Sequence, residues 1–404
     1  MNILIICANW YNRGDEAAIR AMIDELKLIL PESTIKIHFN QEVDEIPYSS
    51  IEIIKSFRRI EGRNKIKEFF YYMAVRTNGK IPYLGIDRNK FNIFVDAVRW
   101  ADYAIYAPGG PCIGDYYSVR KRLLDMMEII ISNNVPFSLY SPSVGPFTLD
   151  KKRVSRILKK AEIVCFREEI SQKYFYSICP DKKTTATLDS AFQHPIDEQK
   201  NGLKFNNYVE LNGFMGKYKK VVGITITDLK WHRNYNSGEK AIIINETFKK
   251  FIPYLEEEGF GVLFIPQLFG PNNDMGYMSN FAGNNSYVMS DKYDCYFQQY
   301  VISKLYAVVG MRYHSNIFSA KMGTPFVSIS YEQKMEGFMK KAGLQNYCIN
   351  VDELSFDSLK IAFQKMISSH DKYAEQLNIK RKQFQKESFK TTKMIVDNIK
   401  KVCG

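Results

Sequence analysis

No apolar run in the sequence approaches the ~20 residues that a helix needs to cross a lipid bilayer. The first residues, MNILIICANW, carry no basic segment and run directly into a loop, so they predict a first strand rather than a signal peptide. The seven cysteines are scattered and form no Cys-x-x-Cys pair, which argues against a disulfide framework and against a zinc site. We therefore expect a soluble, cytoplasmic protein with buried thiols and no bound metal.

Aromatic and basic residues, in contrast, are plentiful. The chain has 404 residues, of which 45% are hydrophobic, with 26 tyrosines and 27 phenylalanines, and it is long enough for two cores. The formal net charge of +12 has two interpretations: solvated helix faces, or attraction to anionic substrates and to an anionic membrane surface. The second would place the protein peripherally at the inner face of the cytoplasmic membrane. No recognition motif for nucleic acid accompanies the charge, so we expect no nucleic-acid partner.

Apolar runs alternate with helical stretches in the first half of the chain. Residues 2–8 form a continuous apolar run, typical of a buried parallel strand, and residues 16–30 show the apolar spacing of an amphipathic helix. The same patterns predict strands at 35–39, 103–106, 137–140, 163–166 and 185–188, and a helix at 118–133. Residues 47–90 are rich in charge and aromatics, and we expect helices or an inserted loop there.

A second series of the same kind follows a polar stretch that we interpret as a linker. It predicts strands at 221–227, 261–266, 305–309 and 325–329, and helices at 242–257 and 315–322. The predicted fold is therefore α/β and GT-B-like, with two Rossmann-like domains facing a cleft and a helical C-terminal tail. The predicted boundaries are 1–192 for the N-terminal domain, 193–218 for the linker, 219–352 for the C-terminal domain and 353–404 for the tail.

Two glycine-containing turns follow strands of the first domain, where open α/β sheets bind ligands. Residues 12–17 (Asn-Arg-Gly-Asp-Glu-Ala) start the first helix, whose backbone amides can hold an anion. The alternative is a structural role for these residues. Asp15 would cap the helix, and the negative charge of Glu16 would interact favourably with the positive end of the helix dipole. Gly109 and Gly110 let the backbone approach a ligand closely, although tight turns use the same residues.

The turn after the strand at 305–309 carries the strongest chemical signal. Arg312 and His314 stand two residues apart where a helix begins. An arginine fork next to an imidazole forms an anion site that can also exchange a proton near neutral pH. We therefore favour a functional role for this pair over a structural one.

Together these motifs resemble the polysaccharide pyruvyltransferase family over both predicted domains. Six short segments carry the resemblance, in the order and spacing of the family: residues 12–17, Gly109-Gly110, 143–147 (Ser-Val-Gly-Pro-Phe), 167–171 (Arg-Glu-Glu-Ile-Ser), 189–192 (Asp-Ser-Ala-Phe) and 312–334. The last runs from Arg312-Tyr313-His314 through Lys321-Met322-Gly323-Thr324-Pro325 to Tyr331-Glu332-Gln333-Lys334. Two departures stand out: Glu168 replaces an aspartate, and an arginine usual after the first strand of the second domain is missing.

The resemblance implies a phosphoenolpyruvate donor, a sugar acceptor such as a lipid-linked glycan of capsule or exopolysaccharide biosynthesis, and no metal, nucleotide or other cofactor. It also implies that Arg312 clamps the donor and that His314 is the acid/base residue. Asp15 or Glu16, on the opposite domain, would take the acceptor proton or hold sugar hydroxyls. Further substrate contacts are expected from the remaining motif residues and from the cations nearest the missing arginine: Asn12, Gly14, Gly109, Gly110, Lys334, and Lys230 or Arg233.

Two other functions fit the same fold. A nucleotide-sugar glycosyltransferase also needs cations for a diphosphate in the second domain. A non-catalytic protein that binds a glycan or a lipid surface would keep the fold but release no phosphate from phosphoenolpyruvate.

Overall fold

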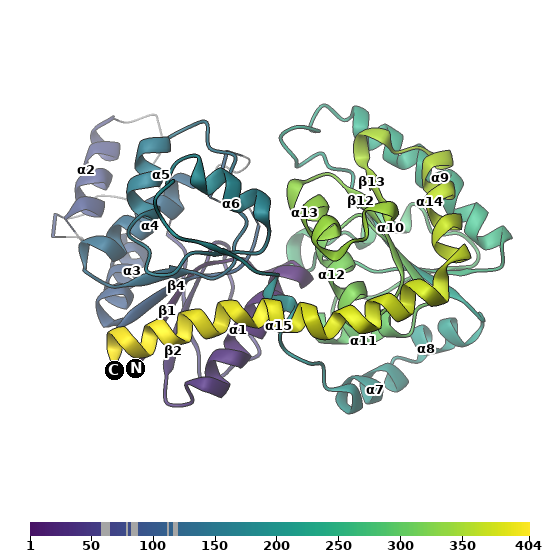
Figure 1. Ribbon diagram of the computed structural model, residues 1–404, viewed down its shortest axis with the longest axis horizontal. Helices are drawn as coiled ribbons and strands as arrows, with labels where there is room; N and C mark the ends of the chain where they lie inside the picture. The colour runs from purple at the N-terminus through teal and green to yellow at the C-terminus, as the bar shows by residue number, and fades with distance from the viewer. Residues whose placement is uncertain (58–64, 78–79, 82–87, 111–112, 116–119) are drawn as a thin grey trace. The chain divides into compact units, whose positions relative to one another are not determined.

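The chain divides into two compact units. The computed structural model describes residues 1–57, 65–77, 80–81, 88–110, 113–115 and 120–404. Unit 1 comprises Met1–Trp10, Ala18–Ser190 and Ser388–Gly404, and unit 2 comprises Tyr11–Ala17 and Ala191–Glu387. Figure 1 shows helices packed against both faces of the central sheet in each unit.

Unit 1 is built on a five-stranded parallel sheet with the order β3-β2-β1-β4-β5. Its strands are β1 (Asn2–Ala8), β2 (Thr34–Phe39), β3 (Glu52–Ile54), β4 (Tyr103–Tyr106) and β5 (Phe137–Leu139), with the short pair β6 (Cys165–Phe166) and β7 (Thr185–Ala186) beside them. Its helices are α1 (Arg13–Ile29), whose first turn belongs to unit 2, α2 (Lys65–Arg76), α3 (Arg88–Trp100), α4 (Arg120–Ser132), α5 (Lys151–Leu158) and α6 (Glu169–Tyr176). The strands predicted at 2–8, 35–39, 103–106 and 137–140 are thus confirmed.

Unit 2 has a six-stranded parallel sheet with the order β10-β9-β8-β11-β12-β13. Its strands are β8 (Val221–Thr225), β9 (Gly261–Phe264), β10 (Ser286–Val288), β11 (Ala307–Gly310), β12 (Phe326–Ser330) and β13 (Cys348–Asn350). Its helices are α7 (Glu198–Asn207), α8 (Val209–Gly216), α9 (Glu239–Glu257), α10 (Met275–Ser279), α11 (Cys295–Ser303), α12 (Tyr313–Met322), α13 (Gln333–Ala342), α14 (Phe356–Ser368) and the first part of α15 (His370–Cys403). Both sheets therefore have the strand order of a Rossmann fold.

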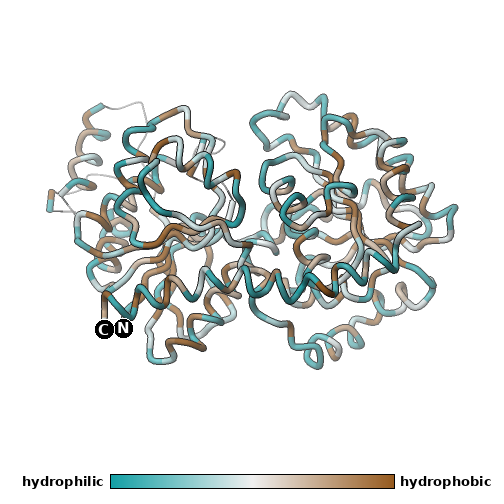
Figure 2. Tube along the Cα trace, viewed as in Figure 1, coloured by the Kyte–Doolittle hydropathy of each residue, from teal (hydrophilic) through white to brown (hydrophobic). Residues whose placement is uncertain are grey.

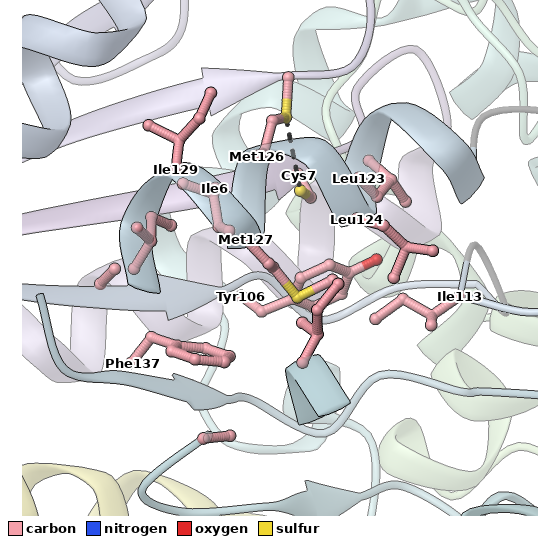
Figure 3. Packing of buried hydrophobic residues seen from close by; sticks show 14 of the residues in the cluster. Ile6, Cys7, Tyr106, Ile113, Leu123, Leu124, Met126, Met127, Ile129 and Phe137 are labelled. Atoms are coloured by element: carbon pink, nitrogen blue, oxygen red, sulfur yellow. Dashed lines mark hydrogen bonds between the residues drawn. The ribbon is translucent and has the colours of Figure 1, made fainter. Parts of the chain in front are cut away.

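Each sheet is buried on both faces, as its continuous apolar strands predict. Figure 2 shows the hydrophobic stretches concentrated in the strands, with hydrophilic residues on the outer helices. In unit 1, side chains of α4 such as Met126 and Met127 pack on Ile6, Tyr106 and Phe137 from the sheet (Figure 3). Burying each large apolar side chain contributes about 1.5–3 kcal/mol, so this cluster is a main source of stability for unit 1.

Two expected boundaries differ from the structure. Residues 193–218, expected as a linker, are largely helical, because Asp197 caps α7 through the Lys200 N–H and α7 packs on α11. The C-terminal tail is helical as predicted, but its residues belong to both units. In unit 1 it is held by buried hydroxyl groups: Thr391 Oγ1 lies 2.6 Å from Ser141 Oγ and 2.7 Å from Thr187 Oγ1. The two termini consequently lie side by side in unit 1 (Figure 1).

The family-like motifs at 143–147 and 167–171 meet Asp189, the first residue of the motif at 189–192, inside unit 1. Buried Arg167 donates to Asp189 (2.7 Å) and to Ser143 Oγ (2.8 Å). Glu168 accepts hydrogen bonds from Ser143 Oγ and from Ser171 Oγ. Because a buried charge is costly unless it is paired, this network holds the loops after β5, β6 and β7 in one arrangement.

The described cysteines are free thiols: Cys7, Cys165, Cys179 and Cys295 are buried, and Cys348 and Cys403 are half-buried. Cys112 lies outside the described residues. Among the helices that the structure describes, none has the length and apolar composition needed to cross a membrane.

Buried His38 makes unit 1 sensitive to acid. It lies in β2 with its ring against Phe94 and its Nδ1 3.4 Å from the Cys7 backbone nitrogen. Burial lowers the pKa of His38 from 6.5 to about 3, and the charge of Arg122 acts in the same direction. The unfolded chain then binds a proton that the folded protein does not. The contribution to stability is therefore complete above pH 6.5 and is lost as the pH falls toward 3.

We expect the wild-type protein to lose about 2 kcal/mol of unfolding free energy through His38 between about pH 7 and about pH 5. Urea unfolding at the two pH values measures this loss. His38→Gln has no imidazole to protonate at this position. Its unfolding free energy should therefore fall by about 2 kcal/mol less than that of wild type between the two pH values. His194→Gln, at a half-buried imidazole of unit 2, is the control. Equal acid losses in wild type and His38→Gln would contradict the assignment.

Candidate active site

Four loops of unit 2 follow neighbouring strands of its sheet. The loop after β8 carries His232, and the loop after β9 carries Asp274. The turn after β11 carries Arg312 and leads into α12 with His314, and the turn after β12 leads into α13 with Lys334. The strand order reverses between β8 and β11. At such a switch point, open α/β sheets bind ligands beyond the carboxyl ends of their strands. The topology therefore brings these side chains to one edge of the sheet.

The turn between β11 and α12 is fixed by short side chains. Thr225 Oγ1, at the end of β8, accepts a hydrogen bond from the Arg312 N–H (3.3 Å), and Ser315 Oγ donates to the Arg312 carbonyl (2.6 Å). A Cβ at Gly310 would lie 2.0 Å from Asn316 Oδ1, so only glycine fits there. These contacts tie the turn to β8 and set the directions of Arg312 and His314.

Arg312 is held by a buried carboxylate. Only 8% of Arg312 is exposed, and its Nη2 lies 3.3 Å from Asp274 Oδ2. Asp274 also accepts from the Leu268 N–H at 3.2 Å. Burial raises the pKa of Asp274, while the Arg312 charge and the backbone donors oppose the shift. The guanidinium is thus placed in advance, beside a carboxylate with which an incoming anion would compete.

Residues 11–17 belong to unit 2 although they follow β1 of unit 1. Arg13 N–H donates to the Gln267 carbonyl (2.8 Å), and Phe269 N–H donates to the Tyr11 carbonyl (3.1 Å). Asn12 forms an antiparallel bridge with Leu268. Asp15 and Glu16, expected on the opposite domain, therefore lie in the same unit as Arg312 and His314, because this backbone pairing holds their segment to the loop after β9.

Gly14 is in direct contact with His314. A Cβ at Gly14 would lie 1.8 Å from His314 Nδ1 and 2.4 Å from His314 Cβ. Asn12, rather than Asp15, caps α1: its Oδ1 accepts from the Gly14 N–H at 2.9 Å. The motif at 12–17 thus supports one side of the His314 ring through Gly14. Asp15, the next residue after Gly14, is half-buried.

Glu16 is engaged in holding this segment. Its carboxylate accepts from Arg13 Nη1 (2.6 Å) and from the Cys295 N–H (3.2 Å) at the start of α11. The Arg13 guanidinium lies 3.6 Å from the centroid of the Phe269 ring. Only 2% of Glu16 is exposed. Asp15 is therefore the more accessible carboxylate of the motif.

The basic residues after β8 differ sharply in burial. Lys230 and Arg233 are exposed, whereas His232 between them is only 3% exposed. Lys334, expected near the donor, is buried, and its Nζ lies 2.5 Å from Glu332 Oε2. Arg13, Arg312 and Lys334 are thus buried positive groups of unit 2, and the His232 imidazole is buried near Lys334.

The glycine pair expected to contact substrate lies in unit 1, after β4. The Gly109 carbonyl accepts from the Ser143 N–H at 3.1 Å. A Cβ at Gly110 would meet none of the described residues within 4 Å, so packing against that part of the chain does not require a glycine there.

The sequence interpretation missed Arg13, His232 and Asp274. His232 lies between Lys230 and Arg233, the two cations expected to contact substrate. The sequence of a loop does not show which of its side chains is buried. Asp274 follows no recognisable motif. Within the described ranges, no three His, Cys, Asp or Glu side chains are grouped so as to hold a metal ion.

Solved structures similar to this chain share its fold. UDP-GlcNAc 2-epimerase from Neisseria meningitidis, bound to UDP-GlcNAc, aligns with 99% of this chain and 100% of its own at a TM-score of 0.58 and 12% identity. S. aureus MnaA with UDP aligns with 99% of this chain and 96% of its own at a TM-score of 0.59 and 10% identity. At this identity the likeness concerns the fold alone, and it confirms the predicted GT-B-like class.

Sequence relatives are more specific. The chain is 23% identical over 401 residues to the amylovoran biosynthesis protein AmsJ of Erwinia amylovora, covering 91% of this chain and 92% of AmsJ. The family model described as polysaccharide pyruvyl transferase matches residues 12–333, from the Gly14 motif through the Arg312-x-His314 turn. Because this match spans most of the sequence, the chain belongs to the polysaccharide pyruvyl transferase family.

Proposed function

We propose that the protein transfers a pyruvyl group from phosphoenolpyruvate to two hydroxyls of a sugar, forming a pyruvate ketal and releasing phosphate. The observation that carries this proposal is that buried Arg312 and Lys334 follow neighbouring strands of the unit 2 sheet, at the same carboxyl edge as His314. Phosphoenolpyruvate bears a phosphate and a carboxylate, and both need fixed positive charge and hydrogen-bond donors.

The reaction needs proton transfer but no oxidant. C3 of the donor gains a proton, C2 becomes oxocarbenium-like, and one sugar oxygen bonds to C2. The C2–O bond to phosphate then breaks, and the second sugar oxygen bonds to C2. Of the two hydroxyl protons, one ends on C3 and the other on the released phosphate. A general acid, a general base and an anion clamp therefore suffice.

The geometry supports a role for each group. We assign His314 as the acid that protonates C3, and Arg312 and Lys334 as the clamp for the anionic groups. Asp15 is the base for a sugar hydroxyl, because Glu16 is engaged by Arg13 and by the α11 N–H. Lys230 and Arg233 stay outside the clamp because their side chains are exposed.

Donor dependence is the decisive experiment. Purified protein is incubated with candidate lipid-linked oligosaccharides and either phosphoenolpyruvate or sugar nucleotides. We expect phosphate release and a product heavier by one ketal-linked pyruvyl unit with phosphoenolpyruvate alone. Consumption of a sugar nucleotide instead would identify a glycosyltransferase, and acceptor binding without phosphate release would identify a non-catalytic binding protein.

Gly14→Ala tests the contact between the two motifs. Because the new Cβ displaces the His314 ring, we expect pyruvyl transfer to fall by about 10²-fold, the order expected for a catalytic group misplaced by about 1 Å. Alanine favours a helix over glycine by about 1 kcal/mol, so loss of helix stability is not an alternative cause. Steady-state kinetics measure the effect.

Gly213→Ala is the matched control, since a Cβ at this helical position in α8 would meet nothing within 4 Å. It should leave turnover unchanged. Wild-type activity in Gly14→Ala would contradict the contact with His314.

The acceptor is proposed to be a lipid-linked precursor of an exopolysaccharide, supported by the relative AmsJ, which is named for amylovoran biosynthesis. The net charge of +12 then supports peripheral binding to an anionic membrane. We expect flotation with anionic liposomes at low salt and its loss at high salt, because salt screens such attraction. Absence of binding at both salt concentrations would make the charge an ordinary solvated surface.

A further inference from the structure

His232 is held in one orientation in the loop after β8. Its ring stacks on Tyr235 with centroids 5.0 Å apart and meets the Tyr331 ring nearly at right angles. Its Nδ1 accepts from the Asn234 N–H at 3.3 Å, which assigns the neutral ring's proton to Nε2. That Nε2 lies 3.6 Å from Glu332 Oε1. The imidazole thus faces a carboxylate from the turn after β12.

Glu332 stands between two basic groups. Lys334 Nζ is 2.5 Å from Glu332 Oε2, while His232 approaches the other carboxylate oxygen. The side chains of His232 and Glu332 are each 3% exposed, and that of Lys334 is 11% exposed. Lys334 Nζ also lies 5.8 Å from the centroid of the Tyr313 ring. Tyr313 is the residue between Arg312 and His314 in the sequence. The negative charge of Glu332 is therefore located next to the proposed donor site.

The protonation of His232 decides how the Glu332 charge is shared. Burial lowers the pKa of His232 and the Lys334 charge acts in the same direction, whereas Glu332 opposes them. Among the described residues, the other titratable groups facing the ring are the phenols of Tyr235 and Tyr331. Burial and Glu332 raise the pKa of Tyr331, so this phenol stays neutral. With a neutral imidazole, Glu332 neutralises Lys334. With an imidazolium, it is shared between two cations.

We propose that His232 is a positioning residue for the anionic donor. On protonation it draws Glu332 away from Lys334, and the ammonium becomes available to the phosphate or carboxylate. This inference rests on the proposed function, since it takes Arg312 and Lys334 as the donor clamp. A bound anion supplies the negative charge that stabilises the imidazolium. Donor binding therefore takes up a proton, and the affinity falls as pH rises.

Calorimetry of phosphoenolpyruvate binding tests this coupling. In wild type, titrated from about pH 7 to about pH 8.5, we expect the affinity to fall by up to about tenfold per pH unit. Titrations in buffers of different ionisation enthalpy should show proton uptake. In His232→Gln we expect weaker binding at neutral pH, a flatter pH dependence and less proton uptake. Asn236→Ala, at an exposed position of the same loop, is the matched control.

A second variant separates this role from a merely structural one. Glu332→Gln removes the charge that neutralises Lys334, so adding it to His232→Gln should restore donor affinity by about tenfold, the order of one charge-assisted hydrogen bond. A pH dependence in His232→Gln equal to that of wild type, or no rescue by Glu332→Gln, would overturn the inference while leaving the donor assignment intact. If wild type does not bind phosphoenolpyruvate, the proposed function and this inference both fail.

Discussion

Replacing His314 by glutamine is expected to lower turnover by about 10²–10⁴-fold, the usual effect of removing a general acid. Glutamine keeps a hydrogen-bonding group of similar size but cannot deliver a proton to C3 of the enol. Imidazole can do so near neutral pH with little adjustment by its surroundings. Because Arg312 and Lys334 remain, the apparent donor constant should change by only a few-fold.

The structure supports this role through the placement of the ring. His314 is the second residue of α12, only 7% exposed, and Gly14 packs against its Nδ1 side. The turn before it is tied to β8 by Thr225. A group held in this way loses little conformational entropy when it reaches the transition state.

Measuring kcat and the apparent donor constant separately distinguishes two roles. If His314 only binds phosphate, His314→Gln should raise the donor constant with a modest fall in kcat, and the acid role would move to Asp15. His194→Gln, at a half-buried imidazole, is the control and should retain wild-type kinetics.

Arg312→Lys is expected to cost about 2–4 kcal/mol of transition-state stabilisation, which appears as a fall in kcat/KM for phosphoenolpyruvate. Lysine keeps the charge but loses the planar fork that pairs with a phosphate or carboxylate through two hydrogen bonds. The side chain is buried against Asp274. A lysine ammonium there would remain paired with Asp274 and present fewer donors to the substrate.

Steady-state kinetics with varied phosphoenolpyruvate measure this loss. Arg381→Lys, at an exposed position of α15, controls for the general effect of the exchange and should have wild-type kinetics. Wild-type kinetics in Arg312→Lys would remove Arg312 from the donor clamp.

Much of the fold follows from local sequence patterns. The continuous apolar runs at 2–8 and 103–106 form buried strands of parallel sheets, as predicted, and so do residues 221–225 of the run at 221–227. Polar composition predicted the conformation of a segment less well than apolar runs did. Residues 198–216 are helical because capping by Asp197 and packing on α11 outweigh their glycines and polar side chains.

The sequence by itself determined strands β8, β9, β11 and β12 and the helix after β11, and hence that Arg312 and His314 start a helix at the carboxyl edge of a parallel sheet. Only the tertiary structure decided what surrounds them. Glu16 meets the Cys295 N–H across 279 residues of chain, and that contact helps to bring Gly14 against His314. The same holds for His232 and Glu332, which come from different strand ends. Periodicity reports the local conformation of a segment, whereas pairing between distant segments depends on packing that only the folded chain defines.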